Sequence, residues 1–93
     1  MSKIILQGHI VVPDVDLAKV QEALITHEML TRQESGCLIF DVTQDSINSN
    51  KFNVYEEFTD QQAFDRHQLR VKNSNWGKVT VNLQRHYQIS HCV

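Results

Sequence analysis

The sequence predicts an α+β domain in which a four-stranded antiparallel sheet carries helices on one face. Stretches with a period of two residues alternate with stretches at helical spacing, and each helical stretch follows a strand-like one. The order strand, helix, strand, strand, helix, strand is the split β-α-β, ferredoxin-like arrangement. No linker, repeat or low-complexity tract interrupts the 93 residues, so we treat residues 1–93 as a single domain.

The chain opens with a strand and a long helix. Residues 4–12 are rich in β-branched and aliphatic side chains, and Gly8 among them indicates a bulge or a close approach of another backbone. A helix is expected from about residue 15 to residue 34, where one stripe recurs at helical spacing. That stripe consists of Leu17, Val20, Leu24 and His27. Gly36 is placed to end the helix in a left-handed conformation.

A hairpin follows. Residues 37–44 and 51–58 predict two strands, because the six residues between them are mostly polar and favour a turn. The second strand alternates, and one of its faces carries Phe52, Val54, Glu56 and Phe58. Glu56 is therefore an acid on an otherwise apolar face.

The last part of the chain predicts a second helix, a short third helix and a fourth strand. Thr59 followed by Gln62 has the spacing of a capping box, so the second helix is expected to begin there. The polar residues 72–75 break this helix, and a short amphipathic helix follows from Trp76. Residues 85–91 can form the fourth strand.

Composition excludes several classes of protein. The net charge is −2 with no basic stripe, which argues against nucleic-acid binding. No apolar run approaches the length of a membrane span, and the first residues lack a signal-peptide pattern. Two cysteines do not form a disulfide framework, so a reduced, cytoplasmic protein is expected. A short chain with one sheet face uncovered by helices favours a homodimer that covers an apolar face.

Most histidines and cysteines suggest no chemistry. The sequence contains no nucleotide-binding glycine loop, no Cys-x-x-Cys pair and no zinc-protease motif, so no metal site is expected. Cys37 is expected to act as a small buried hydrophobe. His91 and Cys92 lie at the end of the chain, where disorder is expected. His27 completes an apolar row and is expected to be a satisfied interior or rim histidine, and His9 has no assigned role.

His67 and Glu56 are the candidates for chemistry. His67 lies on the buried stripe of the second helix, which should cover the strand that contains Glu56. A buried carboxylate is costly unless it is paired, and the imidazole is a natural partner. Such a pair can transfer protons or anchor a polar ligand group, or the two side chains can simply satisfy each other. Residue types alone favour the purely structural alternative slightly.

Two stretches resemble the antibiotic biosynthesis monooxygenase family. Residues 32–40 read Arg-Gln-Glu-Ser-Gly-Cys-Leu-Ile-Phe, similar to that family's pattern at the end of its first helix. Residues 55–67 are similar to the family's strand glutamate, Ser/Thr cap, Ala-Leu/Phe pair and following histidine. The resemblance extends over about residues 4–90.

This resemblance implies a homodimeric α+β barrel with a pocket between helices and sheet in each subunit. Catalytic members oxidise small phenolic or quinol substrates with O2 and use no flavin, haem or metal, so no cofactor is expected. The resemblance assigns the catalytic positions to His67 and Glu56. Substrate-binding side chains are expected at Phe40, Phe52, Phe64 and Trp76.

The chain also departs from the family pattern. After His67 it continues Gln-Leu-Arg-Val-Lys-Asn instead of the common Ser/Thr-x-His-Phe, so the rim of the pocket differs. The first strand lacks the asparagine of haem-degrading relatives. Residues 40–45 resemble an isomerase of a phosphorylated autoinducer in the same superfamily. An isomerase of a small phosphorylated dione and a non-catalytic small-molecule binder are therefore the alternatives.

Overall fold

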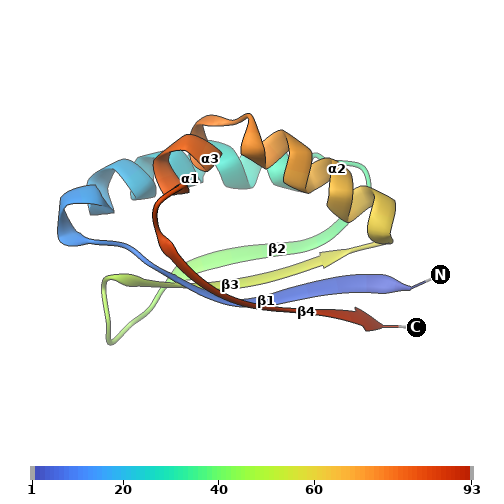
Figure 1. Cartoon of the computed structure of the whole chain (residues 1–93), viewed down its shortest axis with the longest axis horizontal. Helices are drawn as coiled ribbons and strands as arrows, with labels where there is room; N and C mark the ends of the chain where they lie inside the picture. The colour runs from blue at the N-terminus through green and yellow to red at the C-terminus, as the bar shows by residue number, and fades with distance from the viewer. Residues whose placement is uncertain (1, 93) are drawn as a thin grey trace.

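The computed structural model describes residues 2–92, which form one antiparallel sheet with its helices on a single face (Figure 1). The elements are β1 (Lys3–Val11), η1 (Asp14–Asp16), α1 (Leu17–Arg32), β2 (Cys37–Gln44), β3 (Lys51–Phe58), α2 (Gln61–Lys72), α3 (Asn75–Thr80) and β4 (Gln84–Cys92). The strand order is β2-β3-β1-β4, and all neighbouring strands are antiparallel. The predicted ferredoxin-like α+β fold is confirmed.

The strand register brings one acidic side chain under the helices. Glu56 of β3 lies opposite Leu6 of β1 and opposite Phe40 of β2. The alternation predicted for β3 is present, since Phe52, Val54, Glu56 and Phe58 are all buried. Glu56 is 7% exposed, so the acid lies inside the layer between sheet and helices.

The helices bury the stripes that the sequence predicts. The buried residues of α1 are Val20, Ala23, His27 and Thr31, and those of α2 are Ala63, Phe64 and His67. Toward the end of α1 this stripe becomes polar. Polar side chains of α1 and α2 therefore meet above Glu56.

The start of α2 differs from the prediction by one residue. Asp60 is the N-cap, and its carboxylate accepts a hydrogen bond of 2.8 Å from the backbone N–H of Ala63. The capping box predicted from Thr59 is therefore wrong, because the adjacent aspartate is an equally good cap and occupies the position. The backbone N–H of Thr59 instead donates to the carbonyl of Gly36.

Two glycines allow close approaches between elements, but Gly36 does not cap α1 as expected, because the helix ends at Arg32 with Gln33 as its C-cap. Gly36 has a φ of +92°, and a Cβ there would lie 2.5 Å from the Cβ of Ala63. Gly8 has a φ of +153°, and a Cβ would lie 1.9 Å from the carbonyl oxygen of His86. Gly36 thus lets the end of α1 and the start of α2 approach each other, and Gly8 lets β4 approach β1.

The uncovered face of the sheet is more polar than expected. Alternate residues of the strands point away from the helices, among them Gln7, His9, Asn53, Tyr55, Glu57 and His86. The same face also carries Ile5, Val11 and Ile39, so it is mixed and not largely apolar as expected. Exposed apolar side chains gather elsewhere, for example at Ile89 of the edge strand β4, which is 52% exposed.

The end of the chain is ordered as a strand. His91 pairs with Ile4 and Cys92 with Lys3, so the disorder expected at these residues is corrected. Both free cysteines lie at or near the surface, Cys92 exposed and Cys37 half-buried against the core. Within residues 2–92, no helix has the length and hydropathy to cross a membrane.

Candidate active site

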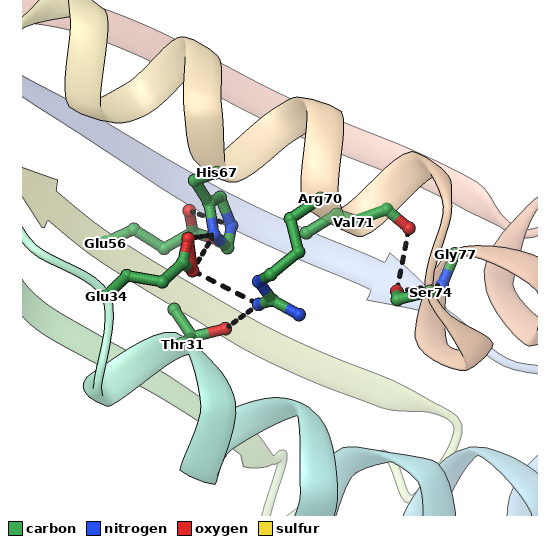
Figure 2. A network of polar contacts seen from close by, with 8 residues as sticks. All are labelled: Thr31, Glu34, Glu56, His67, Arg70, Val71, Ser74 and Gly77. Carbon is green, nitrogen blue, oxygen red and sulfur yellow. Dashed lines mark hydrogen bonds and ion pairs between the residues drawn. The ribbon is translucent and has the colours of Figure 1, made fainter.

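A polar cluster lies where the turn after α1, helix α2 and strand β3 meet. Figure 2 shows Glu34 from the turn, His67 and Arg70 from α2, and Glu56 from β3 pointing toward one another. The Asp60 cap fixes the start of α2, and helical spacing then turns His67 inward with Ala63 and Phe64. His67 is 2% exposed.

The imidazole of His67 is held from one side. Its Nδ1 lies 2.9 Å from Oε2 and 3.2 Å from Oε1 of Glu34. Arg70 Nη2 donates to the same Oε2 at 3.2 Å and to Thr31 Oγ1 at 2.8 Å. Because a carboxylate can only accept, Nδ1 carries the proton and Nε2 keeps its lone pair. Nε2 lies 3.7 Å from Oε1 of Glu56.

Burial favours the neutral forms of both the His67 imidazole and the Glu56 carboxyl group. Burial, and to a smaller extent the charge of Glu34, raises the pKa of Glu56 to about 8. Burial lowers the pKa of His67, and its hydrogen bond to Glu34 opposes this effect. Near pH 7 a neutral imidazole therefore faces a protonated carboxyl group. Oε1 of Glu56 is buried and has no hydrogen-bond partner among residues 2–92.

His27 adds a third neutral, buried group. Its ring stacks on that of Trp76 at 4.8 Å with an interplanar angle of 4°, and it meets Phe40 edge-on at 5.2 Å. Burial, then the charges of His67 and Arg70, lowers the pKa of His27 to about 3. The expected interior position is confirmed by its 4% exposure, and among residues 2–92 its Nδ1 has no hydrogen-bond partner.

A small chamber of about 70 Å³ adjoins the cluster, and Leu6, Glu56, His67, Trp76 and Tyr87 are among its lining residues. At about 30 Å³ per molecule, this volume suits roughly two waters. Ser74 helps to position one of its walls, because its hydroxyl donates to the carbonyl of Val71 and accepts from the N–H of Gly77, which fixes the start of α3 (Figure 2). Among residues 2–92, no group of three or more His, Cys, Asp or Glu side chains could hold a metal ion.

Comparison with known proteins identifies the family. The model of the antibiotic biosynthesis monooxygenase family matches residues 4–70. The chain belongs to the antibiotic biosynthesis monooxygenase family. The resemblance noted in the sequence is thereby confirmed, and the matched segment contains the whole polar cluster but neither α3 nor β4. No curated protein matches the sequence.

Solved structures agree on the fold. A Bacteroides thetaiotaomicron protein described as a possible oxidoreductase is 17% identical with a TM-score of 0.78, and the alignment covers 97% of each chain. A conserved protein from Methanosarcina mazei is 17% identical with a TM-score of 0.78, covering 100% of this chain and 95% of that one. A structure named antibiotic biosynthesis monooxygenase is 19% identical with a TM-score of 0.71, covering 100% and 97%.

In this family member the residues predicted for substrate binding lie in different environments. Trp76 lines the chamber. Phe40, Phe52 and Phe64 all belong to the core, where Phe64 packs against Phe58 at 5.6 Å and Phe40 meets the ring of His27 at 5.2 Å. None of these three phenylalanines lines the chamber.

Sequence reasoning missed Glu34 as the closest partner of His67. The expected pairing of His67 with Glu56 needs correction, because Glu34 makes the short contact at Nδ1, whereas Oε1 of Glu56 lies 3.7 Å from Nε2. Helical spacing contained a signal for the residues around Glu34 but not for Glu34 itself: Thr31 lies four residues after His27, and Arg70 lies three residues after His67. Extending both stripes would have brought the ends of the two helices together.

Proposed function

We propose that this protein is a cofactor-independent monooxygenase that oxidises a small phenolic or quinol substrate with O2. One observation carries the proposal: in a family of monooxygenases, Glu34 holds a neutral His67 that lines a small chamber together with Glu56. A neutral imidazole with one nitrogen fixed by a carboxylate is suited to general-base catalysis.

The proposed reaction begins with proton transfer. His67 Nε2 accepts the proton of the substrate hydroxyl, and Glu34 stabilises the imidazolium through Nδ1–H. The protonated carboxyl of Glu56 donates a hydrogen bond to the resulting oxyanion and holds it in place. The substrate anion passes one electron to O2, and the two radicals combine to a peroxide. Collapse of the peroxide leaves one oxygen atom in the product as a carbonyl and releases the other as water.

We further propose that the protein acts as a homodimer. The edge strand β4 is exposed along its whole length, and the apolar side chains of Tyr87 and Ile89 lie 38% and 52% exposed on it. Exposed apolar side chains on an unpaired edge strand favour a protein partner. Sedimentation at micromolar concentration tests this, since a stable monomer of the 10.8 kDa chain would contradict it.

Oxygen uptake with anthrone, without added metal or flavin, tests the activity. One O2 should be consumed for each anthraquinone formed, and ¹⁸O2 should place one labelled atom in the product. His67→Ala should lower the enzymatic uptake by roughly 10²–10⁴. The same substitution at the exposed His91 is the matched control and should leave uptake unchanged. Elemental analysis and the absorption spectrum of the active protein test the absence of a cofactor.

A second candidate function is supported by the same pair. A neutral base next to a protonated acid can also move a proton from a carbon next to a carbonyl to the carbonyl oxygen, which is the chemistry of an isomerase. An isomerase of a phosphorylated dione would convert its substrate without O2 uptake. A non-catalytic binder would gain thermal stability with ligand and turn nothing over.

A further inference from the structure

A second cavity lies outside the chamber, between α1 and the connection from α2 to α3. It measures about 310 Å³, at the lower end of the range of small-molecule sites. Its apolar lining residues are Ala23, Leu30 and Trp76, and its polar ones include Thr26, His27 and Arg70. We call this cavity the outer groove.

Two buried polar atoms without partners belong to residues that line the outer groove. They are Arg70 Nε and His27 Nδ1. Arg70 is held through Nη2 by Thr31 and Glu34, and Figure 2 shows its guanidinium lying between α1 and α2. Buried donors and acceptors without partners are rare in native proteins because they are costly. Within residues 2–92 the side-chain hydrogen bonds of Arg70 use Nη2, so Nη1 is left for an acceptor oxygen of a ligand in the groove.

The groove is lined by one cation, Arg70, whose charge is partly balanced by the ion pair with Glu34 at 3.2 Å behind it. Arg70 is its charged residue, and no acidic residue is among those that line it. His27 contributes no charge near neutral pH, because its pKa is lowered to about 3 by burial. Arginine with free N–H groups favours a carboxylate as partner. The flat ring of Trp76 favours a planar apolar body.

The outer groove and the chamber share a wall. His27 and Trp76 line both cavities, and their rings are stacked on each other. A ligand in the groove therefore contacts the pair that borders the chamber of His67 and Glu56. The chamber alone has room for O2, water or the hydroxyl group of a substrate, so the ring system that carries this hydroxyl needs the volume of the groove.

We propose that the outer groove binds a planar aromatic carboxylate of about two fused rings, with the carboxylate on Arg70 and the ring against Trp76. In its link to catalysis this inference rests on the proposed function, because the bound acid would be the substrate class of the monooxygenase site. Arg70 and His27 are then specificity-determining residues.

Binding of 1-hydroxy-2-naphthoate, measured by titration calorimetry, tests the groove directly. The neutral amide of the same acid is the matched ligand. The acid should bind roughly 10- to 100-fold more tightly than the amide, as a charge-assisted hydrogen bond allows. Equal affinity for both would overturn the assignment of Arg70.

Two variants locate the site. Arg70→Gln should weaken binding of the acid to the level of the amide. Arg70 also contacts Glu34, so Thr26→Phe provides an independent variant: Thr26 is exposed and lines the groove, and the larger side chain should fill it while the fold is kept. Thr26→Phe should weaken binding of acid and amide alike, roughly tenfold or more. Unchanged binding in folded Thr26→Phe would overturn the groove as the site.

His67→Ala separates this inference from the proposed function. His67 does not line the outer groove, so the variant should bind the naphthoate as the wild type does. In the wild type the naphthoate should also inhibit oxidation of anthrone competitively. If anthrone is not oxidised at all but the naphthoate binds with the expected dependence on Arg70 and Thr26, the proposed function fails and the groove remains a binding site. If anthrone is oxidised and the naphthoate neither binds nor inhibits, the groove assignment fails alone.

Discussion

Two adjacent residues of β3 show how completely position determines the chemistry of a glutamate. Glu56 points toward the helices, is 7% exposed and has a pKa raised to about 8. Glu57 points to the uncovered face, where the Tyr55 hydroxyl and the Lys3 ammonium group contact its carboxylate. These two contacts lower the pKa of Glu57. Near pH 7 one glutamate is an acid and its neighbour is an anion.

The pleat of the strand produces this difference, since successive side chains point to opposite faces. Desolvation penalises the charged form of Glu56, whereas hydrogen bonds and an opposite charge favour the charged form of Glu57. A protonated carboxyl beside a neutral imidazole is suited to proton transfer. A charged carboxylate beside Lys3 is suited to an ordinary surface ion pair. The following predictions test this contrast between the two faces.

The largest effect is expected for the histidine on the helix side. His67→Ala should lower turnover of a confirmed substrate by roughly 10²–10⁴, because it removes the proposed general base. His86 lies on the uncovered face, so His86→Ala should leave turnover within about twofold of the wild type. This change is far smaller than the loss expected for His67→Ala. Initial rates of O2 uptake measure both, with thermal melts to verify folding. Near wild-type turnover in His67→Ala would refute the base assignment, and loss of folding would favour a structural pair.

Glu56→Gln should change how stability depends on pH. A carboxyl whose pKa is raised on folding contributes stability below its unfolded value of 4.5, and this contribution is lost as pH rises toward 8. At about 1.4 kcal/mol per pH unit, the free energy of unfolding of the variant should rise relative to the wild type by about 4 kcal/mol between pH 5 and 8. Urea unfolding across this range measures it. A constant difference between the two proteins would mean that Glu56 is ionised in the folded state.

His27→Phe should change the free energy of unfolding at acidic pH, whereas Glu56→Gln changes it toward alkaline pH. A histidine with a lowered pKa contributes stability above its unfolded value of 6.5, and this contribution is lost as pH falls toward 3. Relative to the wild type, the variant should gain about 3 kcal/mol between pH 6.5 and 4. Phenylalanine keeps the stack on Trp76 and removes the unpaired Nδ1. A parallel pH profile for the two proteins would show that His27 is charged or exposed in the folded state.

The sequence was sufficient to predict the fold and half of the cluster. A period of two along β3 singled out Glu56, and helical spacing singled out His67, because periodicity reports which face a side chain takes. The partner Glu34 escaped this reasoning because it lies in the turn after α1, where periodicity ends. Thr59 and Asp60 are both good caps one residue apart, so composition could not choose between them.

Other features depend on packing in three dimensions. The volumes of the chamber and the outer groove follow from how α3 lies against α1, and no local pattern encodes that distance. The exposed end of β4 was expected to be disordered, yet its pairing with β1 over nine residues orders it. Pairing with a distant strand is likewise invisible in a short window of sequence.

The smallest effect is expected for the second glutamate. Glu57→Gln keeps a side-chain oxygen that can accept a hydrogen bond from Tyr55. It removes only the ion pair with Lys3, in which Nζ of Lys3 lies 2.9 Å from Oε1 of Glu57. Exposed ion pairs contribute little, so the urea midpoint at pH 7 should change far less than in Glu56→Gln. The dependence of the stability difference on pH should also have the opposite sign from that of Glu56→Gln. A carboxylate with a lowered pKa stabilises the fold above its unfolded value of 4.5 and loses this contribution as pH falls, so variant and wild type should converge in acid. Unfolding at two protein concentrations separates effects on folding from effects on association. If Glu57→Gln instead gained stability toward alkaline pH, as Glu56→Gln should, the assignment of the two glutamates to opposite environments would be wrong.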